Sequence, residues 1–101
     1  EKATCMILND NTFVMLLVES FFSTFTIKPI SDATKSCEVI NCIQVESREK
    51  VDEMVTNAVK AGGTEPRQAQ DHGWMYYRGF QDINGHLWEV SFMDESKAEN
   101  I

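Results

Sequence analysis

Two largely apolar runs separated by a short polar stretch open the chain, and no regular pattern of hydrophobic and polar residues follows them directly. Residues 3–8 and 13–18 each have the pattern of a strand, and the polar residues 9–12 between them predict a hairpin turn. Residues 19–36 show no clean period, so we expect a connector. Its aromatic residues are expected to anchor to the core, and they are Phe21, Phe22 and Phe25.

The period changes from two to 3.6 after residue 47. Residues 38–46 are rich in strand-forming types, and an amphipathic helix is predicted from about Arg48 to Ala61. Ser47 is the expected N-cap, and the helix is expected to end at Gly62-Gly63. The expected buried stripe of this helix consists of Val51, Met54, Val55, Ala58 and Val59.

Alternation returns after the helix. We expect a short extended piece near 64–70, a strand near 74–80 and a last strand from 86 through 92. The second half of the chain is therefore predicted to fold as strand, helix, strand, strand, strand.

The turn before the last strand leads to an isolated acid. The run Asp82-Ile-Asn-Gly85 provides the side-chain hydrogen bonds and the glycine freedom of a tight reversal. Alternation along the strand then puts Leu87, Glu89 and Ser91 on one face. The other face, which is ready to pack on a helix, carries Trp88, Val90 and Phe92. A carboxylate facing an enclosed cavity is costly without a metal, a cation or a proton, so Glu89 is a site candidate.

The same segment resembles the closing hairpin of the vicinal-oxygen-chelate superfamily, whose form is Phe-x-Asp-Pro-x-Gly-(Asn or His)-x-x-Glu-hydrophobic. The superfamily includes glyoxalase I, fosfomycin-resistance and bleomycin-resistance proteins and extradiol dioxygenases. Ile83 stands where proline is usual. Together with residues 71–80 and 13–17, the segment looks closest to predicted lactoylglutathione lyase-like proteins of bacteria. The matching residues are Phe80, Asp82, Gly85, His86, Glu89 and Val90.

This resemblance implies an α+β fold of βαβββ modules, in which two modules form a half-open barrel around a cleft. Residues 37–93 match the second module, whereas residues 1–18 supply only the hairpin of the first, which is incomplete in this chain. We expect one domain over 1–101, with a tail at 94–101. About 20 to 30 residues are expected to precede Glu1, since a strand and a helix take about that many.

The resemblance also implies that Glu89 is a metal ligand, for Zn, Ni, Fe or Mn. A second ligand in metal-using relatives is commonly a histidine on the first strand of the second module. Here that strand offers Ile40, Cys42 and Gln44 on one face, and core packing is the favoured interpretation of these residues. Glu19 is expected at a strand end in solvent. We therefore expect weak or no metal binding, which would leave Glu89 as a general base.

The remaining candidates come from the aromatic segment around residues 72–80. His72 lies in a predicted loop and is a candidate for proton transfer beside Glu89, against the alternative that it is merely solvated. His86 is expected at the surface, and Arg78 is expected to pair with an acid away from the cleft. Gly79 would leave room in the cleft. The candidate ligand-binding residues are Tyr77, Met75, Leu87, Ser91 and Cys42.

Composition limits the classes of partner. A chain of 101 residues with 43% hydrophobic residues supports one core, and a net charge of −7 argues against nucleic-acid binding. No stretch has the length of a membrane span, and no signal peptide is present, so we expect a soluble, cytoplasmic protein. Three cysteines without metal-site spacing predict reduced, buried thiols rather than disulfides.

Three functional hypotheses follow. The first is a glyoxalase-like protein that binds a small molecule in its cleft, and the second is a divalent-metal-dependent lyase resembling lactoylglutathione lyase. The third is a structural or interaction domain. The apolar opening hairpin also predicts a homodimer that buries hairpins or neighbouring sheet edges.

Overall fold

The computed structural model describes residues 2–96 and contains two compact units, which divide between Ser31 and Asp32. Residues 97–101 of the expected tail lie outside the described residues, as does Glu1. Each unit is built from its own stretch of sequence. The expectation of one domain over the whole chain stays a prediction.

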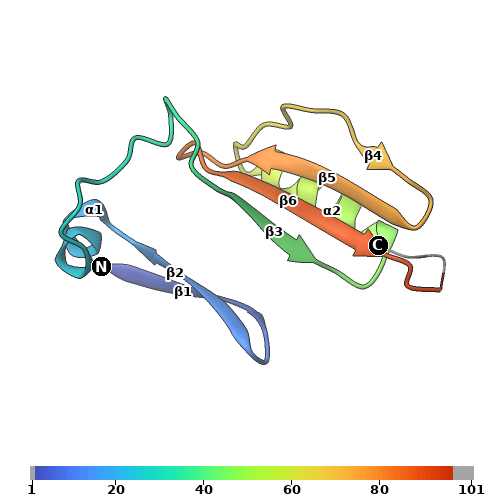
Figure 1. Ribbon diagram of the computed structural model, residues 1–101, viewed down its shortest axis with the longest axis horizontal. Helices are drawn as coiled ribbons and strands as arrows, with labels where there is room; N and C mark the ends of the chain where they lie inside the picture. The colour runs from blue at the N-terminus through green and yellow to red at the C-terminus, as the bar shows by residue number, and fades with distance from the viewer. Residues whose placement is uncertain (1, 97–101) are drawn as a thin grey trace. The chain divides into compact units, whose positions relative to one another are not determined.

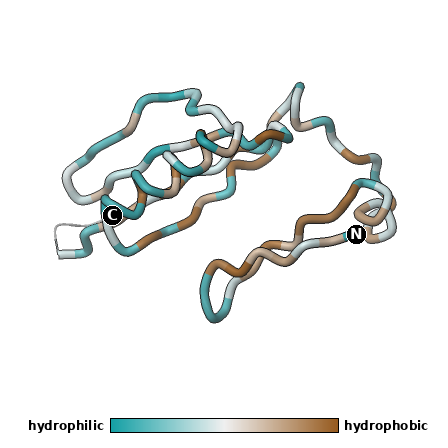
Figure 2. Tube along the Cα trace, turned by 180° about the vertical axis from the view of Figure 1, so that it is seen from behind, coloured by the Kyte–Doolittle hydropathy of each residue, from teal (hydrophilic) through white to brown (hydrophobic). Residues whose placement is uncertain are grey.

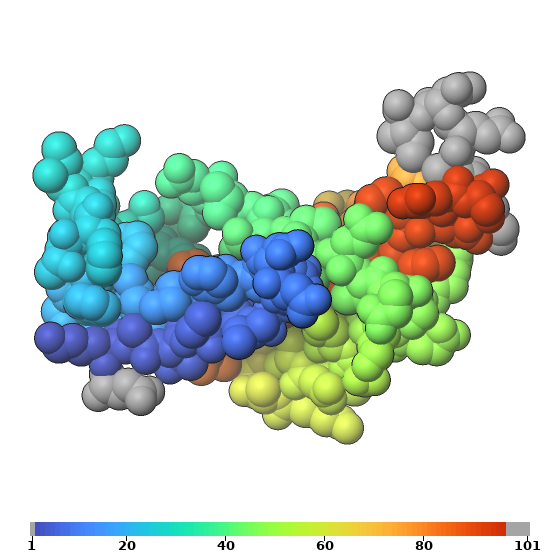
Figure 3. Space-filling model, turned by 90° about the horizontal axis from the view of Figure 1, so that it is seen from below, coloured from blue at the N-terminus to red at the C-terminus, as the bar shows by residue number. Residues whose placement is uncertain are grey.

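The first unit is the predicted hairpin. Strands β1 (Ala3–Asn9) and β2 (Thr12–Leu17) pair antiparallel, and the Asn11 amide donates to the Asn9 side chain within the turn at 2.9 Å. The two strands lie side by side in Figure 3, and Figure 2 shows hydrophobic colour along them on either side of a hydrophilic turn.

A short helix, α1 (Glu19–Phe22), and a 3-10 turn, η1 (Ser23–Phe25), follow the hairpin. The prediction that all three aromatic residues anchor to the core is wrong. Phe21 is half-buried and packs edge-on against Phe25, with the ring centroids 5.2 Å apart, but Phe22 and Phe25 are exposed. Successive residues of a helix point in different directions, so one short helix cannot direct all of them inward.

The second unit has the predicted order of elements. Its four-stranded sheet has the order β3-β6-β5-β4, with β3 parallel to β6 and the other pairs antiparallel. Helix α2 covers one face of this sheet (Figure 1). The βαβββ module is therefore confirmed. Its elements are β3 (Ile40–Gln44), α2 (Arg48–Lys60), β4 (Gln70–Asp71), β5 (Met75–Gln81) and β6 (Leu87–Met93).

Helix α2 begins and ends where the sequence indicates. The Ser47 hydroxyl accepts a hydrogen bond from the Lys50 amide at 3.1 Å, and Gly62 follows the helix with a φ of 110°. Val51 and Val55 are fully buried, but Val59 is 43% exposed, so its assignment to the stripe is wrong. Each step of four residues turns a helix by about 40° past a full circle, and two such steps carry Val59 out of the buried stripe.

The core lies between α2 and the sheet. Val90 of β6 is fully buried with the two valines of the helix, and half-buried side chains surround them. These are Val45, Met54, Tyr76, Phe80 and Phe92. Trp88 lies on the same side and stacks on Phe80, with the ring centroids 6.2 Å apart. The predicted division of the last strand into a helix-facing and an open face is thus confirmed.

Asp82 holds the turn before β6 even though Ile83 replaces proline. One carboxylate oxygen accepts hydrogen bonds from the amides of Asn84 and His86, at 2.9 and 3.0 Å. The other accepts the indole N–H of Trp88 at 3.0 Å. The turn therefore fixes both its own backbone and the Trp88 side chain, which stacks on Phe80.

The three cysteines are exposed and unpaired, which corrects the expectation that they are buried. Cys5 is on the hairpin, and Cys37 lies before β3, where its Sγ is 3.2 Å from the carbonyl of Val39. Cys42 is on the sheet face that α2 leaves uncovered. No helix of the described chain, residues 2–96, is long and apolar enough to cross a membrane.

Candidate functional site

The sheet face opposite α2 carries most of the predicted site residues, and the strand register shows how they are arranged. One row across the sheet consists of Cys42 on β3, Glu89 on β6 and Gly79 on β5. The next row contains Ser91 and Tyr77. Glu89 therefore sits near the centre of the open face, with polar or small residues on both sides.

Gly79 keeps the space beside Glu89 free. A Cβ atom at this position would lie 3.1 Å from the carbonyl oxygen of Trp88 and 3.8 Å from Cγ of Glu89. Any larger side chain would extend over the carboxylate, because directly opposed residues of an antiparallel pair share one face. The expectation that Gly79 leaves room on this face agrees with this geometry.

A groove of about 70 Å³ runs along this face. Tyr77, Leu87 and Glu89 line it as the sequence suggested, and Ile40 adds apolar surface from β3. One wall comes from the loop between α2 and β4. The loop residues in the lining are Pro66, Arg67 and Gln68, and Gln70 of β4 continues the wall.

Other predicted site residues lie outside the lining of this groove. Ser91 is only 2% exposed, and its hydroxyl is 3.7 Å from Sγ of Cys42. Met75 lies at the far end of β5, opposite Met93. The role of these residues in ligand binding stays a prediction.

His72 follows β4 and is exposed. Its ring centroid lies 6.1 Å from that of Tyr77, and its amide donates to the carbonyl of Met75 at 2.8 Å. The histidine is therefore next to one groove residue but does not itself line the groove. His86 is exposed at the turn, as expected.

The donors near Glu89 do not fit a protein-held metal ion. Within residues 2–96, no three histidine, cysteine or acidic side chains come together in a group that could hold one. Cys42 is the cross-strand neighbour of Glu89, and Gln44 on the same strand is exposed. Two or three weak donors on an open sheet face do not make the closed donor set of a tight metal site.

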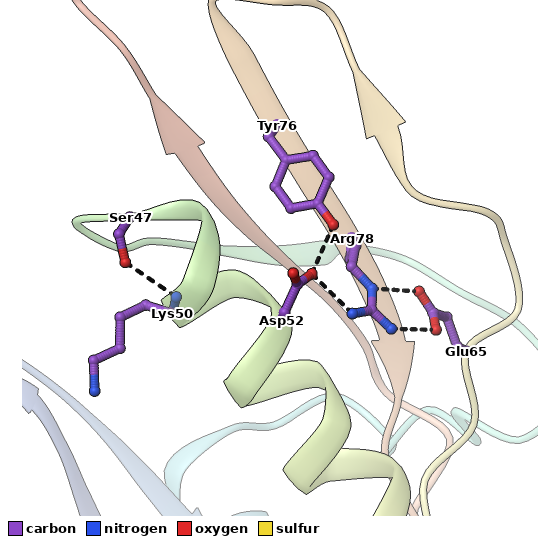
Figure 4. Close-up of polar contacts among 6 residues, drawn as sticks. All are labelled: Ser47, Lys50, Asp52, Glu65, Tyr76 and Arg78. Carbon is purple, nitrogen blue, oxygen red and sulfur yellow. Dashed lines mark hydrogen bonds and ion pairs between the residues drawn. The ribbon is translucent and has the colours of Figure 1, made fainter.

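The opposite face of β5 carries an ion-pair network against α2 and the following loop (Figure 4). The Arg78 guanidinium donates two hydrogen bonds to Glu65, at 2.9 and 2.7 Å, and a third to Asp52 at 2.9 Å. The Tyr76 hydroxyl also donates to Asp52, at 2.6 Å. The expectation that Arg78 pairs with an acid away from the open face agrees with this geometry.

These contacts change the acid–base properties of the network. The Tyr76 hydroxyl, together with Arg78, holds the pKa of Asp52 below its usual value. Arg78 likewise lowers the pKa of Glu65, and the pKa of Arg78 itself is raised, chiefly by Glu65. Burial, followed by the contact with Asp52, raises the pKa of Tyr76. All four groups therefore keep one protonation state across the neutral range.

A second ion pair joins the start of α2 to β4. Arg48 donates to both carboxylate oxygens of Asp71, at 2.9 and 3.0 Å, and its guanidinium lies 5.0 Å from the ring centroid of Tyr76. Hydrogen bonds from Arg48 and from the Gly73 amide lower the pKa of Asp71 to about 2. The short strand β4 is thus tied to the helix by charge.

Sequence patterns did not reveal the loop that forms the groove wall. Residues 64–70 have no period, and their register is set by an isolated bridge between Thr64 and Gln81 and by the Glu65–Arg78 pair. The one available signal was a lone arginine, Arg67, next to a proline in a predicted extended piece.

Comparisons with known proteins agree with this architecture. No protein-family model and no curated protein matches the chain. A solved structure of a hypothetical protein from S. aureus is 24% identical to this chain, with a TM-score of 0.72. The matched region covers 90% of this chain and 68% of the S. aureus chain. A glyoxalase/bleomycin resistance protein/dioxygenase from Nocardioides is 13% identical, with coverage of 99% and 72% and a TM-score of 0.64.

At these identities the likeness shows the fold. The chain has an α+β fold with a βαβββ module of the glyoxalase/bleomycin-resistance type. The fold that the resemblance of residues 80–90 implied is therefore the fold of this structural neighbour from Nocardioides.

Proposed function

We propose that this chain is a glyoxalase-like protein that binds a small, partly apolar organic molecule on the open face of its sheet, with Glu89 as the main polar contact. The observation that carries the proposal is the groove beside Glu89. It combines one carboxylate with the apolar surfaces of Ile40, Leu87 and Tyr77. Ligand sites typically have this composition, an apolar lining with few polar groups.

The arrangement gives Glu89 a defined chemical role. Its carboxylate is partly buried in the centre of the sheet, where a ligand hydroxyl, amide or acidic C–H group could donate to it. A carboxylate in such a place can act as a hydrogen-bond acceptor or as a general base. Tyr77, in the next cross-strand row, would contact the apolar body of the ligand.

A lyase that resembles lactoylglutathione lyase is the second candidate. The position of Glu89 on the open face favours it, since the corresponding residue is a metal ligand in metal-using relatives. The donors within residues 2–96 do not complete a metal site, so this function needs ligands from elsewhere. A purely structural or interaction role is the third candidate.

Metal analysis and ligand titration of the same protein distinguish these candidates. We expect less than about 0.1 equivalent of zinc, nickel, iron or manganese after purification without chelators, since one good ligand cannot hold a divalent ion tightly. We also expect aromatic fragments, with phenylacetamide as the first probe, to shift the NMR signals of Leu87 and Glu89. Near-stoichiometric metal that is lost in Glu89→Gln would instead favour the lyase.

A matched variant controls for the change of charge. Glu38→Gln removes the same charge at an exposed position outside the groove, so it should leave fragment binding unchanged. Glu89→Gln should weaken the binding of fragments that donate a hydrogen bond. If no aromatic fragment shifts any residue of the open face, the small-molecule proposal fails.

A further inference from the structure

We infer that Arg67 recognises a negatively charged group on the ligand, so that the natural ligand is a small organic acid with an apolar body. This inference rests on the proposed function and adds a substrate class to it. It starts from the composition of the groove, whose lining includes one acidic side chain, Glu89, and one basic side chain, Arg67.

The Arg67 guanidinium is available for a ligand. Within residues 2–96 no hydrogen bond or ion pair engages it, whereas Arg48 and Arg78 are each held by acidic side chains. An arginine fork binds a carboxylate or phosphate in a two-pronged geometry, which makes an unpaired arginine at a groove wall a specific anion receptor.

The segment that carries Arg67 is anchored rather than free. Glu65, two residues earlier, is bound by both prongs of Arg78, and Thr64 pairs with Gln81 through two backbone hydrogen bonds of 3.0 and 2.8 Å. These contacts hold the start of the loop against β5. Arg67 therefore reaches the groove from a fixed base, which lowers the entropy lost when it binds.

Arg67 also borders a larger hollow, of about 460 Å³, on the side of the loop nearer α2. The charged and aromatic residues that share that hollow are Glu65, Tyr76 and Arg78, and all three are already bound to one another or to Asp52. That hollow lacks the aliphatic wall formed by Ile40 and Leu87. The groove on the open face adds this aliphatic wall, so it is the better site for the apolar body of an organic acid.

Charge sets the direction in which such an acid would bind. The chain has a net charge of −7, and Glu89 would repel a second carboxylate placed beside it. The acid group is therefore directed to Arg67, which leaves the other end of the molecule to face Glu89. The two charges of the groove select one orientation of the ligand.

A pair of probes with the same shape tests the inference. Phenylacetate and phenylacetamide differ in one charge, and NMR titration of the intact chain gives both dissociation constants. We expect phenylacetate to bind about five- to tenfold more tightly at low salt, as for a partly exposed charge-assisted hydrogen bond. In Arg67→Gln the preference should disappear, with the phenylacetamide constant unchanged.

Lys60→Gln is the matched control, since it removes one positive charge at an exposed position outside the groove. It should keep the preference for phenylacetate, which a general effect of net charge would not. The inference is overturned if Arg67→Gln leaves the preference intact or weakens both probes equally. If wild type binds phenylacetamide but shows no preference, ligand binding stands and the role of Arg67 fails. If wild type binds neither probe, the result counts against both the proposed function and the role of Arg67.

Discussion

Gly79 lies directly across from Glu89 in the antiparallel pair of β5 and β6, and its missing side chain leaves the space beside the carboxylate open. The groove depends on this pairing, because both residues line it. A strand position that has no side chain to pack thus keeps a site accessible.

Filling this space should block the groove. In Gly79→Leu we expect phenylacetamide to cause no shift at Leu87 or Glu89, since the new side chain covers the carboxylate. NMR titration measures the effect, and the dispersion of the spectrum reports whether the fold is retained. Thr56→Leu adds the same side chain on the exposed surface of α2 and should bind the fragment normally. Normal binding by Gly79→Leu would contradict the location of the site.

Gly85 is buried in the turn before β6 and has a φ of 96°. A Cβ atom there would lie 2.7 Å from the carbonyl oxygen of Ala33, so alanine meets both backbone strain and a steric clash. We expect Gly85→Ala to lower the free energy of unfolding by about 2 to 3 kcal/mol. Urea denaturation followed by tryptophan fluorescence measures this change.

Gly73 provides the comparison for this turn. Its φ is 85°, but nothing lies within 4 Å of the position of its Cβ. Gly73→Ala should therefore cost only the conformational strain, about 1 kcal/mol. Equal losses in the two variants would show that the contact between Gly85 and Ala33 contributes nothing.

The sequence predicted the second unit well because its determinants are local. Alternation placed Glu89 and Val90 on opposite faces, and the capping and stop residues bounded α2. The same local rules failed where only one face of an element is covered. Cys42 follows the alternation of β3, but α2 covers the other face, so the thiol is exposed.

The groove wall could not be predicted, because it depends on contacts between residues far apart in the sequence. Arg67 lies in the loop between the Arg78–Glu65 ion pair and the pairing of β4 with β5, and both contacts join distant parts of the sequence. Neither contact leaves a periodic signal. The chain has 16 acidic residues, so its sequence does not show that Glu65 is an acid that pairs with Arg78.

Val55 and Val59 test which face of α2 is buried against the sheet. Val55 is fully buried in the core, whereas Val59 is 43% exposed. We expect Val55→Ala to lower the free energy of unfolding by about 2 kcal/mol, and Val59→Ala to change it by less than about 0.5 kcal/mol. Urea denaturation of both variants gives the difference, and similar losses would argue against the observed orientation of the helix.

The Arg78 network predicts how stability depends on pH. Asp52 and Glu65 have lowered pKa values in the folded chain, so the folded state binds protons more weakly than the unfolded state does. Their contribution is complete above the unfolded values of about 4 and is lost as the pH falls through the folded values. Asp71 has a pKa of about 2 in the folded chain, so its contribution to stability is lost only at lower pH.

Arg78→Gln should bring the pKa of Glu65 back toward its usual value, whereas the Tyr76 hydroxyl should still lower the pKa of Asp52. We expect it to lower the free energy of unfolding by about 1 to 2 kcal/mol at pH 7, since the half-buried Glu65 loses its partner. The difference from wild type should shrink at pH 3. Arg67→Gln removes the same charge without an ion pair and should leave the pH dependence unchanged. Denaturant curves at both values of pH measure the effect, and a constant difference would refute the linkage.

The hairpin of the first unit predicts self-association. Ile7 and Phe13 are paired across β1 and β2 and are 76% and 61% exposed, and Met15 continues the same face at 48%. Such a surface is stabilised when a second copy covers it. We propose a homodimer formed through this face and expect a dimer by sedimentation at micromolar concentration. Phe13→Asp should give a monomer, whereas Val59→Asp, at an exposed apolar position of α2, should stay dimeric. A monomeric wild-type protein would rule out this assembly.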